Sequence, residues 1–188
     1  KCSVQRRMLS RLAGRRDVKT LDLPAADTAQ PRPFEVLGIP LSPGFHVVEI
    51  ASQTLGGDLL DEAYGAQRTL YVRSSALVTN LAVHFKLGRD GSLAWVTTLD
   101  KGQPVVQARV RVSDCTGKER ASATTDANGI ARLEGLSPLA PGCTATGELS
   151  EGGGDGYFVS ARATDALGVQ DLAFTWSSWQ KGIEPWRF

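Results

Sequence analysis

The chain has 188 residues, of which 41% are hydrophobic and 22% charged, and this composition is typical of a globular chain with one large or two small domains. Its formal net charge of +1 provides no global field that would favour nucleic acid or an anionic membrane. It holds no apolar run of the roughly 18 residues that a membrane-spanning helix needs. Because the chain begins at Lys1-Cys2 without a signal peptide, we expect it to be a piece of a longer protein.

The first 75 residues predict a β domain with a thin core. Residues 1–20 are basic, and the helical spacing of Val4, Met8 and Leu12 predicts a short helix over residues 3–13. We interpret this helix as a terminal segment without its upstream partners rather than as a phosphate- or lipid-binding element. Residues 55–67 predict a loop, and alternation predicts strands over residues 17–23, 34–37, 45–52 and 68–74. So few strands indicate the closing portion of a sandwich whose opening strands lie upstream of Lys1.

Residues 77–112 carry the clearest pattern in the chain. Leu81, Val83 and Phe85 alternate with Ala82, His84 and Lys86, and this period of two places the first set on one buried face. After the turn residues 88–91, a second alternation runs over residues 92–99, where we expect Trp95 to lie on the buried face. A third alternation, after a turn over residues 100–104, comprises Ala108, Val110 and Val112. Strands at about ten-residue spacing indicate an antiparallel sandwich.

The rest of the chain continues this pattern. We predict further strands over residues 119–124, 130–133, 143–149, 157–165 and 169–176, the last of them with Trp176 on the buried face. Seven or eight strands over residues 76–176 fit a complete immunoglobulin- or fibronectin-like sandwich. The predicted fold class is therefore all-β, with tandem antiparallel sandwiches divided as 1–75 and 76–176. Residues 177–188 form an aromatic tail or linker to the next domain.

Few residues offer chemistry. His46 and His84 alternate within strands and have no Cys or His at metal-ligand spacing, so we interpret both as structural. Residues 126–129 faintly resemble a calcium loop, but Asn128-Gly129 between two strands is better explained as a tight turn. We find no nucleophile–base pair and no phosphate- or dinucleotide-binding motif, and we predict no catalytic residue, metal or cofactor. Binding or mechanical architecture is therefore favoured over enzymology.

Three segments carry a resemblance to a known family: FEVLGIPLSPGFHVVEI (residues 34–50), LYVRSSALVTNLAVHFKLGRDGSLAWVTTL (70–99) and WQKGIEPWRF (179–188). They resemble the bacterial alpha-2-macroglobulins. The resemblance covers most of residues 29–188, and residues 1–28 match less clearly. It implies two macroglobulin-like β-sandwich domains from the front half of a large periplasmic protein. The parent would be anchored to the inner membrane through an N-terminal lipid outside this piece.

The resemblance also implies a function. Proteases cut a bait region in these broad-spectrum inhibitors, and a conformational change follows that traps the protease; many members add a thioester in a C-x-E-Q setting. Cys2, Cys115 and Cys143 read CSVQ, CTGK and CTAT, so we place the reactive chemistry elsewhere in the parent. The implied partners are the parent's other domains, proteases at the bait region and a periplasmic peptidoglycan synthase, with no nucleic acid.

A rival interpretation is a surface adhesin or a carbohydrate-binding sandwich module. An adhesin would more often show near-identical repeats, and the two halves here are not obvious repeats. A sugar-binding sandwich would expose aromatic side chains on one sheet face, whereas we expect Trp95 and Trp176 to be buried.

Two site predictions follow for a periplasmic macroglobulin domain. Cys115 and Cys143 lie at strand–loop junctions of one sandwich in an oxidising compartment, so we expect a disulfide between them rather than two buried thiols. Cys2 would remain unpaired or find its partner upstream. We further expect the tail side chains to dock at the junction between the two domains, or else to belong to the next domain; they are Trp179, Trp186 and Phe188.

Overall fold

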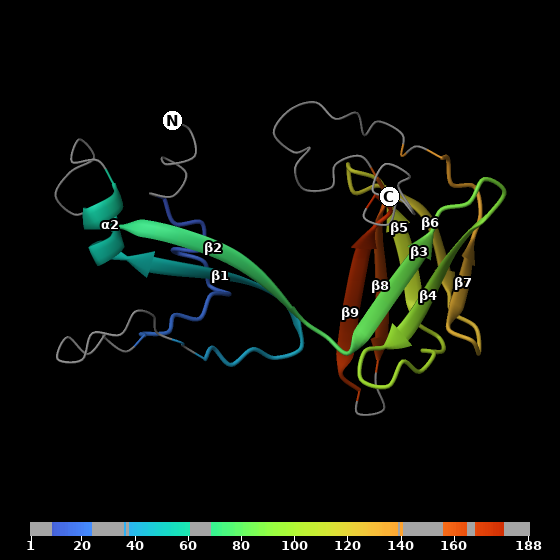
Figure 1. The fold of residues 1–188 in the computed structure, drawn as a ribbon, viewed down its shortest axis with the longest axis horizontal. Helices are drawn as coiled ribbons and strands as arrows, with labels where there is room; N and C mark the ends of the chain where they lie inside the picture. Colours follow the sequence, from blue (N-terminus) through green and yellow to red (C-terminus); the bar gives the residue numbers. More distant parts are fainter. Residues whose placement is uncertain are drawn as a thin grey trace, which may run out of the picture. The chain divides into compact units, whose positions relative to one another are not determined.

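The chain divides into two compact units, Lys1–Ala76 and Leu77–Phe188, each of which is considered by itself. The structure is a computed structural model and describes residues 9–23, 36, 38–60, 69–138, 140, 156–164 and 168–178. Figure 1 labels the strands and the helix.

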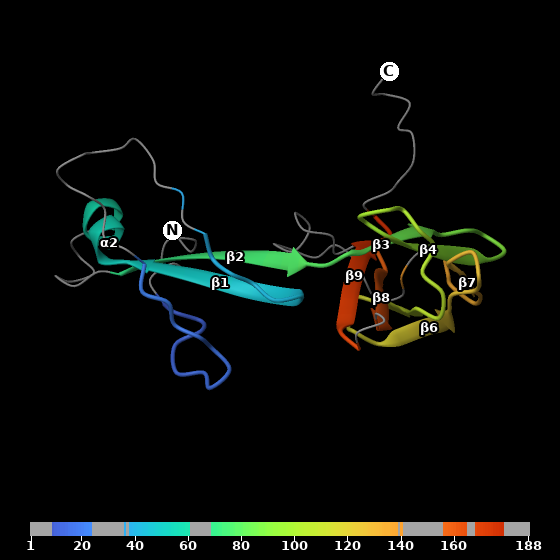
Figure 2. The ribbon, with the colours of Figure 1, turned by 90° about the horizontal axis from the view of Figure 1, so that it is seen from below.

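The second unit contains two antiparallel sheets that pack face to face (Figures 1 and 2). The first sheet has the order β3-β4-β7 and consists of Leu81–Lys86, Ser92–Thr98 and Ile130–Leu133. The second has the order β6-β5-β8-β9 and consists of Glu119–Thr124, Arg109–Ser113, Phe158–Thr164 and Gln170–Trp176. Strands β4 and β5 pair with β7 and β8, which are distant in sequence, so the sheets cannot form from hairpins alone. The predicted all-β class and sandwich architecture are confirmed.

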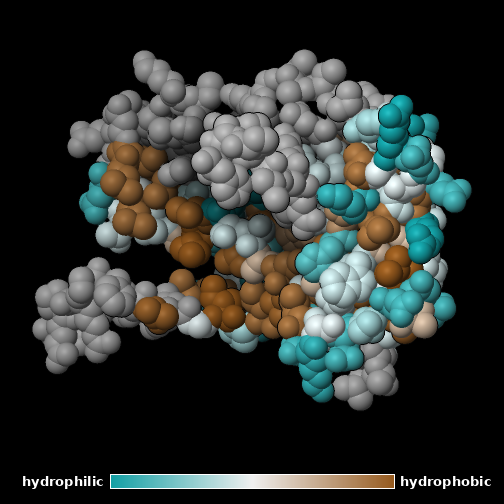
Figure 3. Space-filling view, turned by 45° about the vertical axis from the view of Figure 1, so that its right-hand side comes forward, coloured by the Kyte–Doolittle hydropathy of each residue, from teal (hydrophilic) through white to brown (hydrophobic). Residues whose placement is uncertain are grey.

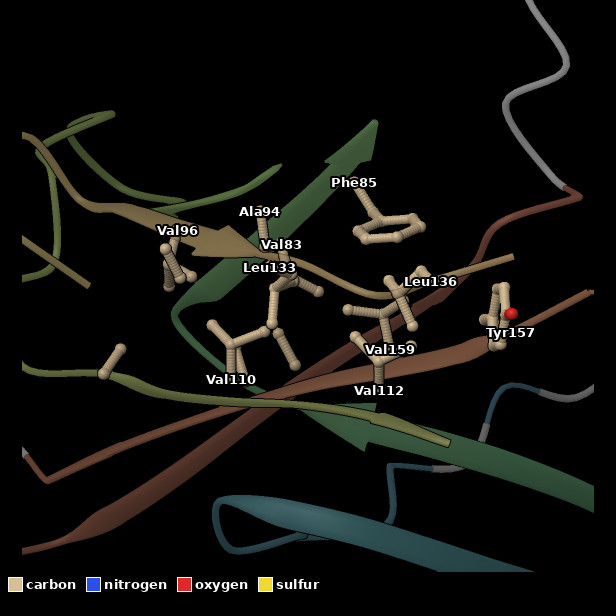
Figure 4. Packing of buried hydrophobic residues seen from close by; sticks show 14 of the residues in the cluster. Val83, Phe85, Ala94, Val96, Val110, Val112, Leu133, Leu136, Tyr157 and Val159 are labelled. Carbon is tan, nitrogen blue, oxygen red and sulfur yellow. The ribbon is translucent and has the colours of Figure 1, made fainter. Parts of the chain in front are cut away.

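The core of this unit lies between the two sheets. Val110 and Val112 on β5 stand opposite Ala161 and Val159 on β8, and all four side chains are fully buried. Figure 4 shows side chains of both sheets pointing toward one another, among them Phe85, Val96, Leu133, Val110, Val112 and Val159. Burying a valine or leucine side chain stabilises a fold by roughly 1.5–3 kcal/mol, so this cluster is the main source of the unit's stability.

The alternation in β3 and β5 is confirmed, but the expected face of β4 is wrong. Ala94 and Val96 are fully buried, whereas Trp95 is 42% exposed on the outer face. Ala94 pairs with Phe85 on β3, so a small residue beside the large ring fits the core. Because side chains alternate with a period of two, this register turns Trp95 outward.

The expected position of Trp176 is also wrong, because Ala173 and Thr175 are the buried residues of β9 and Trp176 is half-buried on the opposite side.

The turn after β6 matches its prediction. The Asp126 carboxylate accepts hydrogen bonds from the backbone N–H groups of Asn128 at 2.8 Å and Ile130 at 3.0 Å. Gly129 has a φ of 73°, and a Cβ added there would lie 2.5 Å from the Val96 carbonyl oxygen. Glycine is therefore required at position 129 by backbone conformation and close packing, and the Asp126 hydrogen bonds close the tight turn.

Tyr157 anchors the start of β8. Its side chain is 1% exposed, and its hydroxyl donates a hydrogen bond to the Ser137 carbonyl oxygen at 3.1 Å. Immunoglobulin-like sandwiches have a comparable tyrosine, which ties the start of a strand to the preceding connection. Burial raises the pKa of Tyr157 above its ordinary value.

The first unit has a two-stranded sheet of β1, Gly44–Ser52, and β2, Leu70–Val78, with the short helix α2, Gln53–Leu59. The strands predicted over residues 45–52 and 68–74 are confirmed, and β2 extends further than expected. The loop predicted from residue 55 is wrong at its start, because the Ser52 hydroxyl caps α2 by accepting a hydrogen bond from Leu55 N at 3.1 Å.

Two other predictions for the first unit differ from the structure. Residues 9–13 form turns instead of a helix, because the Ser10 hydroxyl accepts hydrogen bonds from Leu12 N and Ala13 N. Residues 17–23 contain no strand, and Leu21 and Leu23 are exposed. The strands predicted over residues 34–37 and 143–149 lie mostly or entirely outside the described residues.

Candidate functional site

Only one of the residues singled out as a candidate site is described. Cys115 is exposed in the turn between β5 and β6. Its proposed partner Cys143 lies outside the described residues, as do Trp179, Trp186 and Phe188. The disulfide and the docking of the tail therefore stay predictions.

The turn that carries Cys115 is held by Asp114, whose side chain is completely buried. The carboxylate accepts hydrogen bonds from the Thr116 hydroxyl at 2.6 Å, from Thr116 N at 2.9 Å and from Lys118 N at 3.1 Å. Arg120 donates from Nε at 2.7 Å and from Nη2 at 2.6 Å. The Thr116 hydroxyl contributes most to lowering the pKa of Asp114 to about 2, followed by Arg120. This charged network fixes the backbone on both sides of Cys115, and the sequence Asp114-x-Thr116 with Arg120 is its local signal.

The outer face of the β3-β4-β7 sheet presents an aromatic pair. The His84 and Trp95 rings stand opposite each other across β3 and β4, with their centroids 5.7 Å apart and tilted by 35°. Trp95 Nε1 donates to the Asn128 carbonyl oxygen at 3.2 Å, which fixes the indole orientation. Leu93, on the same strand face, is 38% exposed. The structure therefore provides an oriented aromatic surface where the sequence predicted a buried one.

The β6-β5-β8-β9 sheet carries a second aromatic group on its outer face. The Phe158 ring lies 5.4 Å from Phe174 and 5.1 Å from Trp176, measured between centroids, with the second pair edge-on. Aromatic pairs at these separations contribute about 0.5–1.5 kcal/mol beyond burial. This group covers the β8–β9 side of the face with a rigid apolar surface.

A charged cluster organises the first unit. The Glu49 side chain on β1 is only 6% exposed, and its carboxylate accepts from Arg73 Nε on β2 at 2.6 Å and from Arg11 N at 3.0 Å. Ser10 also donates its hydroxyl to Glu49, and Arg73 bonds the Leu9 carbonyl. Burial alone would raise the pKa of Glu49, but the hydrogen bonds from Ser10, Arg11 and Arg73 outweigh it and lower the pKa.

Exposed apolar side chains flank this cluster. Phe45 and Val47 are each 50% exposed, and Val72 is 46% exposed. Figure 3 shows that hydrophobic residues lie at the surface beside hydrophilic ones. Surfaces of this composition suit contacts with other protein rather than chemistry.

The described histidines have local partners. His46 Nε2 lies 2.7 Å from the Ser42 carbonyl oxygen, and His84 packs against Trp95. Among the described residues, no three His, Cys, Asp or Glu side chains gather as metal ligands would. In the same part of the chain, the one helix falls short of the length and apolarity required to cross a membrane.

In the described part of the second unit, seven strands in a three-plus-four sheet order form an antiparallel β-sandwich, which is consistent with a macroglobulin domain. A family model, bacterial alpha-2-macroglobulin MG3 domain, matches residues 78–188, which is more than half of the chain. The chain therefore belongs to the bacterial alpha-2-macroglobulin family, as its sequence resemblance indicated. No curated protein matches the chain. Macroglobulin domains of this family are non-catalytic scaffold domains of a larger protein.

Proposed function

We propose that this chain is scaffold within a bacterial alpha-2-macroglobulin that traps attacking proteases in the periplasm. The match of residues 78–188 to the MG3 domain of that family is the observation that carries the proposal. The fully buried core between the two sheets supports it, because a close-packed sandwich transmits displacement without deforming.

In this role the chain keeps neighbouring domains of the parent in position, while the reactive steps occur elsewhere in the parent. A protease cuts the bait region, the surrounding domains rearrange, and the macroglobulin sandwiches move as bodies. The parent's other domains and the trapped protease are the partners, and a periplasmic peptidoglycan synthase is a third partner suggested by the family. An N-terminal lipid would anchor the parent to the inner membrane.

The test compares a large and a small substrate. The full-length parent is mixed with an endopeptidase, and cleavage of a large protein and of a short chromogenic peptide is followed. Trapping encloses the protease, so we expect protection of the large protein while the peptide is still cleaved. The isolated 188-residue chain serves as the control and should protect neither substrate. Unimpaired cleavage of the large protein by the parent–protease mixture would contradict the proposal.

The exposed position of Trp95 favours a second candidate, a carbohydrate-binding module. An oriented indole on an open sheet face is suited to stacking against a sugar ring, and His84 extends the surface. Oligosaccharides are titrated while tryptophan emission is recorded for the wild type and for Trp95→Ala. Saturable quenching that disappears in Trp95→Ala would favour this function, and quenching that persists in the variant would exclude the Trp95 face.

A further inference from the structure

Two arginines stand directly opposite each other in the β6-β5-β8-β9 sheet. In the register of β5 and β8, Arg109 is the partner of Arg162, and both side chains are exposed on the outer face. Paired strands lie only about 4.8 Å apart, and like charges directly opposite each other destabilise a sheet. The isolated sandwich therefore carries an unfavourable charge pair on the two central strands of this sheet, at the end of the β5–β8 register.

The paired residues on the neighbouring strands do not neutralise these arginines. The flanking cross-strand neighbours are Thr124 on β6 and Leu172 on β9, which are both uncharged. Arg111 is different, because it forms an ion pair with Glu119 at 2.7 Å. Within the described ranges of the chain, neither Arg109 nor Arg162 forms an ion pair or a side-chain hydrogen bond.

An apolar surface adjoins the arginines. Along β9, Leu172 is paired with Arg162, and Phe174 follows two residues later on the same face. Phe174 belongs to the half-buried aromatic group with Phe158 and Trp176. Counting only the described residues, one sheet face thus combines two guanidinium groups that lack an ion-pair partner with an apolar strip.

We propose that this face binds an acidic polypeptide segment. Its carboxylates would bind Arg109 and Arg162, whose planar guanidinium groups match carboxylate geometry. An apolar side chain of the same segment would pack on Leu172 and Phe174. Nucleic acid is disfavoured, because the net charge of +1 provides little attraction for a polyphosphate and the rings pack against one another.

The experiment uses the full chain and a fluorescent peptide in which Glu and Leu alternate over about ten residues, the length of a long strand. A second peptide has Gln in place of each Glu, and a single-stranded DNA of equal charge is a third probe. We expect binding of the Glu peptide to weaken as salt is added, and the Gln peptide to bind much more weakly.

The variant Arg109→Gln/Arg162→Gln should bind the Glu peptide roughly tenfold more weakly, since each exposed ion pair contributes a factor of a few. Its melting temperature should stay equal or rise, because the repulsion is removed. The matched control is Arg132→Gln, an exposed arginine on β7 in the other sheet, which should bind as the wild type does.

Equal binding of the Glu and Gln peptides, or full binding by the double variant, would overturn the proposal. Tighter binding of the DNA that depends on the same two arginines would also overturn it, in favour of a nucleic-acid surface. If the double variant unfolds, Arg109→Lys/Arg162→Lys replaces it: this variant keeps the charge but loses the planar donors, so we expect weakened, salt-sensitive binding of the Glu peptide. Binding by that folded variant as tight as that of the wild type would contradict the role of the guanidinium groups.

Discussion

At the scale of single residues, Asp114 is the charged group on which the β5–β6 turn depends. Asp114→Ala removes the acceptor for Thr116, Lys118 and Arg120 and leaves the Arg120 charge without its partner. We expect a lower melting temperature and a lower midpoint in urea, measured by circular dichroism. Asp90→Asn, in the exposed turn between β3 and β4, is the matched control and should unfold as the wild type does.

The same residue predicts a dependence on pH. The pKa of Asp114 is about 2 in the folded chain, below its ordinary value of 3.8, so the folded state favours the ionised form. The stabilisation is therefore complete above about pH 4 and is lost as the pH falls through 2. As the pH is lowered from about 4 to about 2, the urea midpoint should decline more steeply for the wild type than for Asp114→Ala. If the midpoints of the two proteins fall in parallel, groups other than Asp114 cause the acid sensitivity.

Tyr157→Phe isolates one hydrogen bond. The variant keeps the buried ring and loses only the bond to the Ser137 carbonyl oxygen, so we expect a loss of about 1 kcal/mol in the free energy of unfolding. Tyr157→Ala also removes the ring and should lose about 3–5 kcal/mol, by analogy with other buried aromatic residues. Equal losses of unfolding free energy in the two variants would show that Tyr157 stabilises the fold through its hydroxyl rather than through packing of its ring.

At the scale of elements, mutations can test which face of β4 is buried. Val96 is fully buried and Leu93 is 38% exposed, so Val96→Ala should cost about 2 kcal/mol and Leu93→Ala less than about 0.5 kcal/mol. Urea unfolding of the two variants measures the difference. A larger loss for Leu93→Ala would mean that the strand has the opposite face inward.

Strand positions were predictable from sequence far better than strand faces. The period of two located β3, β4 and β5, and turn residues on either side located β6 and β7. In β4 both alternating sets are partly apolar, so Trp95 and Val96 compete for the core and only pairing with β3 decides between them. Helix α2 was missed because Gly56-Gly57 suggests a loop, whereas the Ser52 cap is a weak signal by itself.

The surfaces were less predictable than the elements. His84 and Trp95 come together only through the β3–β4 register, and Arg109 and Arg162 only through pairing of strands distant in sequence. Neither pair can be recognised from the local alternation of residues, because each pair forms only through the topology of the sandwich.

At the scale of the whole molecule, the expected disulfide would tie the β5–β6 turn to a later part of the chain. We expect non-reducing peptide mapping to recover Cys115 and Cys143 in one linked fragment. Closing the loop between Cys115 and Cys143 stabilises the folded state by roughly 3–4 kcal/mol in the loop-entropy model. Reduction of the disulfide should therefore lower the melting temperature. Recovery of both residues as separate peptides would refute the pairing. Cys2→Ser should leave the link intact.

Pairing of β5 with β8 also sets an order of events during synthesis. The β5–β6 hairpin is complete when residue 124 has left the ribosome, but the central partner of β5 begins only at Phe158. At about 5–20 residues per second, several seconds pass in which one edge of the nascent hairpin is unpaired and Val110 and Val112 lack their facing layer. Nascent chains of this kind are prone to edge-to-edge association, and the charged Arg109 and Arg111 beside that open edge would hinder it.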